Sequence, residues 1–155
     1  MSSTRNSKFI RASQEALYRA LTDPSALEVW QAPGDMTGRV HEFDLRVGGG
    51  YEMSLFYPPG EDEALGKTSE GEDRFTARFV ELVPLEKIVE AIVFNSADPA
   101  FSGEMIVEIT LEAEDDGTRV TYLFRDIPPG IRPGDNEEGT RMTLEKLARY
   151  VEGQG

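Results

Sequence analysis

The chain has 155 residues, of which 39% are hydrophobic and 29% are charged; it contains no cysteine and has a formal net charge of −13. This length and balance are typical of one globular domain, so we expect a single domain over residues 1–155. The acidic charge disfavours binding to nucleic acids and anionic membranes, and no apolar run reaches the roughly 20 residues of a membrane-spanning helix.

Helical signals come early in the chain. Ser13 is a good N-cap because its hydroxyl can accept a hydrogen bond from a free backbone N–H, and apolar residues follow it at helical spacing. Thr22-Asp23-Pro24 ends this helix and starts another, since proline fits the first helical turn. We expect the second helix from about Ser25 to Trp30, and a short strand near Phe9 before both helices.

Residues 39–125 are predicted to form strands in a meander. Apolar and polar residues alternate along most of this region. Gly48-Gly49-Gly50 indicates a tight turn or bulge, and Asp115-Asp116-Gly117 is typical of a hairpin turn. Residues 60–73 are acidic and glycine-rich, and they predict a solvated, mobile loop.

The chain is predicted to end in a helix from about Asn136 to Glu152. Thr140, Leu144, Leu147 and Val151 form one apolar stripe along it. A long antiparallel sheet needs its apolar face covered, and only this helix has the length and the stripe to do so. We therefore predict an α+β fold, with an antiparallel sheet of about six to seven strands, a long C-terminal helix against it, and two short helices after the first strand.

Several short motifs are spaced as in a known family. They are Ala20-Leu-Thr-Asp-Pro24 with Trp30-x-x-Pro33, Asp44-Leu-Arg-Val-Gly-Gly49, Glu81-Leu-Val-Pro84 with Ile88-Val89, Thr110-Leu111 with Gly117-Thr-Arg119, and Gly139 ahead of Leu144, Leu147 and Tyr150. In this order they resemble the START-like, or SRPBCC, superfamily, and within it the stand-alone bacterial type of activator-of-Hsp90-ATPase-homologue family. The resemblance implies the helix-grip (Bet v-like) fold, with a cavity between the curved sheet and the C-terminal helix.

The chain departs from the family at two positions. Members usually place a tryptophan directly after the helix glycine, where this chain has Thr140, and often a histidine late in the last strand, where it has Phe124. Both differences are expected to alter the pocket, so the ligand of a relative cannot be assigned to this chain.

Two residues could bring chemistry to such a cavity. His41 is the only histidine, and the two-residue period puts it on one strand face with Phe43, so it points inward unless it is an edge histidine. Glu90 shares a face with Ile88, Ile92 and Phe94. If this face is the inner one, Glu90 is a partly buried carboxylate with a raised pKa. Otherwise Glu90 points to solvent, and the opposite face, with Val89, Ala91 and Val93, is the core. Because both faces of this strand carry apolar residues, either the strand is covered on both sides or one face is a dimer contact.

The candidate cavity wall consists of bulky side chains together with these two residues; the alternative for most of them is ordinary core packing. They are Trp30, His41, Phe43, Tyr51, Met53, Phe79, Glu90, Tyr122, Phe124 and Met142. No catalytic residue is predicted, because the sequence has no nucleophile-elbow motif and a single histidine. One histidine and no cysteine also predict no metal site and no cofactor.

Three functions remain open on this sequence. The first is non-catalytic binding of a small hydrophobic ligand, such as a lipid or a polyketide. The second is a co-chaperone-like interaction domain that contacts an Hsp90-type chaperone, with a role in the stress response, through its acidic surface. The third is a polyketide cyclase-like or hydrolase-like enzyme that uses His41 or Glu90. We expect a cytoplasmic protein, with a homodimer as a further possibility.

Overall fold

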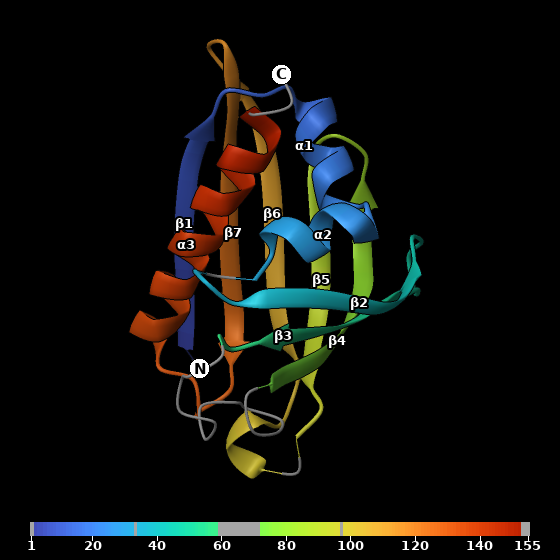
Figure 1. The fold of residues 1–155 in the computed structure, drawn as a ribbon, viewed down its shortest axis with the longest axis vertical. Helices are drawn as coiled ribbons and strands as arrows, with labels where there is room; N and C mark the ends of the chain where they lie inside the picture. Colours follow the sequence, from blue (N-terminus) through green and yellow to red (C-terminus); the bar gives the residue numbers. More distant parts are fainter. Residues whose placement is uncertain (1, 33, 59–71, 97, 153–155) are drawn as a thin grey trace.

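The computed structural model describes residues 2–32, 34–58, 72–96 and 98–152. Within these residues, seven strands form one antiparallel sheet in the order β1-β7-β6-β5-β4-β3-β2 (Figure 1). The strands are β1 (Ser2–Ile10), β2 (Thr37–Asp44), β3 (Gly50–Phe56), β4 (Glu72–Val83), β5 (Lys87–Phe94), β6 (Met105–Glu114) and β7 (Gly117–Ile127). The helices are α1 (Gln14–Leu21), α2 (Pro24–Trp30), the 3₁₀ turn η2 (Pro99–Phe101) and α3 (Pro133–Glu152). The predicted α+β class and element order are confirmed.

The sheet is strongly curved, and local irregularities account for the bends. β2 has a register shift between Val40 and Glu42, and β4 has one between Phe79 and Glu81; such bulges bend a strand and increase its twist. At Gly50, a Cβ atom would lie 1.9 Å from the carbonyl oxygen of Ala77, so only glycine allows β3 to pass β4 this closely. Figure 1 shows the result, with β2 and β3 running at a steep angle to β5, β6 and β7.

The two short helices close one end of the hollow. Ser13 caps α1 and accepts from the Ala16 N–H at 3.0 Å, as the sequence predicts. Asp23 caps α2, which begins at Pro24, one residue before the predicted start. The indole Nε1 of Trp30 donates to the Ala20 carbonyl at 3.0 Å, which joins the end of α2 to α1.

The long helix α3 lies on the concave side of the sheet, along β1 (Figure 1). It begins at Pro133, three residues before the predicted start, because proline is favoured in the first helical turn. Its start is tied to β1 by a hydrogen bond between the Thr4 hydroxyl and the Asn136 side-chain oxygen. None of the helices in the described ranges has the length and hydropathy needed to cross a membrane.

The structure corrects the predicted end of one loop and explains the apolar outer face of β5. The predicted loop at 60–73 extends too far, because Glu72 and Asp73 already pair with β3; residues 60–71 lie outside the described ranges. On the outer face of β5, Val89 and Ala91 are buried within this one chain, and only Val93 is exposed, at 38%. The apolar character of this face is therefore accounted for mostly without a second copy.

Candidate functional site

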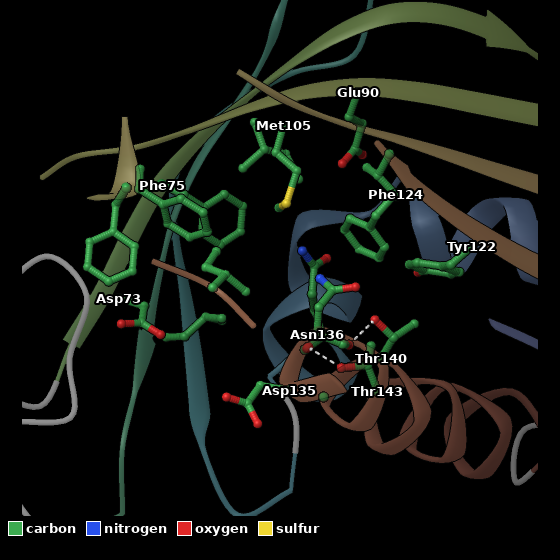
Figure 2. A pocket seen from close by; sticks show the side chains of 18 of the residues that line it. Asp73, Phe75, Glu90, Met105, Tyr122, Phe124, Asp135, Asn136, Thr140 and Thr143 are labelled. Carbon is green, nitrogen blue, oxygen red and sulfur yellow. Dashed lines mark hydrogen bonds between the residues drawn. The ribbon is translucent and has the colours of Figure 1, made fainter. Parts of the chain in front are cut away.

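A cavity of about 460 Å³ lies between the first half of α3 and the concave face of the sheet (Figure 2). Its inner end is formed by buried residues of the short helices and of the central strands, such as Leu27, Ile109 and Glu90. Its outer end includes the exposed residues Arg132 and Asp135, where the connector enters α3. The apolar wall between these ends consists of Leu21, Leu55, Phe75, Ile92, Phe94, Phe101, Met105, Val107, Phe124 and Ile131.

The cavity exists because the facing side of α3 carries short side chains. Asn136, Gly139, Thr140 and Thr143 line it from the helix. At Gly139 a Cβ atom would meet no other heavy atom within 4 Å, so the helix backbone itself borders the empty space. Farther along the helix, Leu144 and Leu147 are long enough to pack against the sheet, and there the core is filled.

A short chain of hydrogen bonds leads to the carboxyl group of Glu90. The amide Nε2 of Gln31 donates to the Tyr51 hydroxyl at 3.2 Å, and the Tyr51 hydroxyl donates to Oε1 of Glu90 at 3.3 Å. Glu90 is only 5% exposed, yet in the described part of the chain no basic side chain forms an ion pair with it. Its side chain points from β5 toward the cavity, on the far side from α3 (Figure 2).

Burial controls the ionisation of these groups. Removal from water disfavours the charged carboxylate and raises the pKa of Glu90 to about 7, against a smaller opposing effect of the Tyr51 hydrogen bond. Burial, followed by the nearby charge of Glu90, also raises the pKa of Tyr51 and of Tyr122, so both phenols stay protonated at neutral pH. Glu90 is therefore the inner-wall group that can change charge near pH 7.

The hydroxyl groups on the helix side are already engaged within the protein. Thr140 donates to the Asn136 carbonyl at 2.7 Å, and Thr143 donates to the Gln31 carbonyl at 3.1 Å. Nearer the outer end, the Tyr57 hydroxyl donates to Oδ2 of Asp73 at 3.1 Å. A molecule in the cavity thus meets apolar side chains, with the Glu90 carboxyl as the main polar feature at its inner end.

The ten predicted wall residues separate into two groups in the structure. Tyr51, Glu90, Tyr122 and Phe124 line the cavity. The other six do not line it: Trp30, His41, Phe43, Met53, Phe79 and Met142. Glu90 lies on the inner face of β5, so the alternative that placed it in solvent is wrong.

Core packing explains most of the second group. Trp30, Met53 and Phe79 are almost completely buried among other core side chains. Phe43 stacks on the Tyr51 ring, with a centroid separation of 5.7 Å, and is therefore one layer removed from the cavity. Met142 is directed toward Gly34, in the connection from α2 to β2.

His41 is excluded by a bulge that the two-residue period does not reveal. Val40 pairs with Met53 and Glu42 with Glu52, so His41 is the extra residue of β2. Its exposed ring lies 2.9 Å from the Ser54 hydroxyl, and it does not share the inward position of Phe43.

Sequence reasoning missed several residues of the wall. Phe75 and Phe94 lie on the inner faces of their strands, and alternation with buried neighbours could have identified them. Gln31, directly after α2, and Asn136 and Gly139 of α3 carry no such signal, because polar and small residues in or beside a helix usually indicate a solvent-facing position. Among the residues that the structure describes, no group of three histidine, aspartate or glutamate side chains could hold a metal ion.

Comparisons with known proteins agree with this architecture. A crystal structure of a protein from Chromobacterium violaceum is 32% identical, with a TM-score of 0.86 over 97% of this chain and 96% of that one. A solution structure of an AHSA1-like protein from Aeromonas hydrophila is 22% identical, with a TM-score of 0.75 over 99% and 94% of the two chains, and shows the same fold. No curated protein matches the sequence. The family model described as Activator of Hsp90 ATPase homolog 1-like protein matches residues 11–152, and the chain therefore belongs to this family.

Proposed function

We propose that this protein binds a small, largely apolar molecule in the cavity between α3 and the sheet, without catalysing a reaction. Membership of the family supports a ligand-binding or co-chaperone-like domain. The cavity favours ligand binding, because its volume of about 460 Å³ falls in the range of small-molecule sites, roughly 300–1,000 Å³. Apolar walls with a few polar groups are also typical of such sites.

The observation that carries the proposal is the unfilled space beside Gly139. Core side chains normally pack to the density of organic crystals, and a void of this size forfeits packing contacts and costs stability. A packed domain needs no such void, since a larger residue at Gly139 or Thr140 would fill it. A ligand that occupies the space would recover those contacts.

The test is a pair of glycine substitutions in the same helix. Gly139→Leu places a side chain in the cavity, whereas Gly134→Leu adds the same side chain at an exposed position where a Cβ also meets no neighbour. Apolar and aromatic compounds are screened by thermal shift and native mass spectrometry against the original protein and both variants. We expect Gly139→Leu to weaken every hit by at least about tenfold, which is about 1.4 kcal/mol, and Gly134→Leu to leave the hits unchanged.

Binding that both variants retain equally would place the ligands outside the cavity and contradict the proposal. A screen without any hit, on protein shown to be folded and free of copurified molecules by native mass spectrometry, would contradict it as well.

A further inference from the structure

We propose that the ligand of this cavity carries a protonated amine, which pairs with the Glu90 carboxylate among the rings of Tyr51, Tyr122 and Phe124. This inference rests on the proposed binding function and specifies the chemical class of the ligand. Three observations support it: the state of the carboxyl group, the rings beside it and the charge of the cavity wall.

The carboxyl group of Glu90 is buried but only partly satisfied. Its position in the sheet, between Phe79 of β4 and Val107 of β6, gives it two apolar neighbours. Tyr51 donates to Oε1, whereas Oε2 accepts no hydrogen bond from the described residues and remains accessible from the cavity. Folding has already removed this group from water, so an incoming ammonium group adds only its own desolvation to the cost of the pair.

Aromatic rings surround the approach to this carboxyl group. Tyr51 extends from β3, and Tyr122 and Phe124 extend from β7 with ring centroids 6.2 Å apart. In the view of Figure 2, the Phe124 and Tyr122 rings lie between the Glu90 side chain and α3, and the charge of Glu90 is one cause of the raised pKa of Tyr122. The π face of an aromatic ring attracts an organic cation, most strongly where both are shielded from water.

The charge of the cavity wall also favours a cation. Its described acidic residues are Asp73, Glu90 and Asp135, and its described basic residue is Arg132. The chain as a whole has a net charge of −13, so its field attracts cations and repels anions. Fatty-acid anions and other carboxylates are therefore expected to bind poorly beside Glu90.

Pairing with an amine makes binding dependent on pH. The pKa of Glu90 is about 7, and that of an alkylamine is about 10, so the charged pair forms best between these values. The titratable groups that face Glu90 are Tyr51 from β3 and Tyr122 from β7, and both stay neutral in this range. β4 and β6 present Phe79 and Val107, and the end of α2 presents Gln31. Tyr57, Asp73, Arg132 and Asp135 line the cavity farther out.

The test compares three probes of one shape: 4-phenylbutylamine, 4-phenylbutanol and 4-phenylbutanoate. Their affinities are measured by ligand-observed NMR at pH 5.5 and pH 8 for the original protein, Glu90→Gln and Glu137→Gln. The second variant is the matched control, because it makes the same substitution at an exposed residue of α3 that does not line the cavity. Gly139→Leu is the control in which an added side chain occupies the cavity.

We expect the amine to bind at least about tenfold more tightly than the alcohol at pH 8, and this preference to shrink at pH 5.5 as Glu90 takes up a proton. Glu90→Gln should abolish the preference, whereas Glu137→Gln should retain it. If the alcohol binds and Gly139→Leu blocks it, but the amine is not favoured or is favoured equally in Glu90→Gln, the amine inference is wrong and the binding function stands. If no probe shows binding that Gly139→Leu blocks, the amine inference and the proposed binding function are both contradicted.

Discussion

The two halves of α3 face the same sheet, yet one half is packed and the other borders an empty space. The second half presents Leu144, Leu147, Ala148 and Val151, all buried in the core. The first half presents Asn136, Gly139 and Thr140, which line the cavity together with the adjoining Thr143. The same backbone geometry therefore serves two purposes. Apolar residues fill the core at one end, and short residues leave the cavity open at the other.

The largest expected difference between the halves concerns stability. Leu147 is completely buried, and Leu147→Ala should lower the free energy of unfolding by roughly 2–5 kcal/mol, because it removes packing and leaves a new void. Thr140→Ala, on the same side of the helix, should change it by only about 0.5 kcal/mol, since Thr140 already borders a void and its hydroxyl bonds back to its own helix. Urea denaturation monitored by circular dichroism measures both; equal losses would refute the division of α3.

The buried carboxyl group provides the second prediction. Its pKa is raised from 4.5 to about 7, so the folded state binds the Glu90 proton more tightly than the unfolded state does between these values. Unfolding then takes place with release of a proton, and stability falls as the pH rises from about 4.5 to about 7. Relative to the original protein, Glu90→Gln should gain roughly 3 kcal/mol at pH 8 and little at pH 4.5.

Denaturation at a series of pH values checks this prediction, with Asp135→Asn as the exposed control. A stability difference between the original protein and Glu90→Gln that is the same at pH 4.5 and pH 8 would show that Glu90 titrates as in water.

Helix propensity provides a smaller test of the same contrast. Gly139→Ala should stabilise the protein by about 1 kcal/mol, because it removes a helical glycine and the added methyl group enters open space. Ala148→Gly in the packed half should destabilise the protein by at least that amount, since it also removes a buried methyl group. Thermal unfolding of the two variants gives the comparison, and a loss of stability in Gly139→Ala would mean that the space beside it is filled.

The fold could be predicted from the sequence because its signals are local. Ser13, Pro24 and the glycines near residue 50 indicate helix starts and turns through their own backbone preferences. Alternation of apolar and polar residues within 39–125 predicted strands in the region that contains β6 and β7. The family resemblance then supplied the arrangement of the sheet around α3, which the structure confirms.

The cavity wall was harder to predict because a wall and a core use the same apolar residues. Phe79 and Phe75 are both inner-face phenylalanines of β4, yet only Phe75 reaches the cavity. Whether a strand residue faces the cavity depends on the length of the helix side chain opposite it. The sequence of the strand or of the helix alone does not tell which two residues lie opposite each other. The prediction that His41 lines the cavity is wrong for a different reason, since a single bulge in β2 moves this residue off the inner face.

The contrast between the two halves of α3 can be measured in one titration. 4-Phenylbutanol is added to ¹⁵N-labelled protein, and amide chemical shifts are followed along the helix and the strands. We predict shifts at Gly139, Thr140 and Thr143 and at the facing strand residues Glu90 and Phe124, with little change at Leu147 and Val151. Shifts spread evenly along α3, or confined to the outer face of the sheet, would contradict a ligand cavity at the first half of the helix.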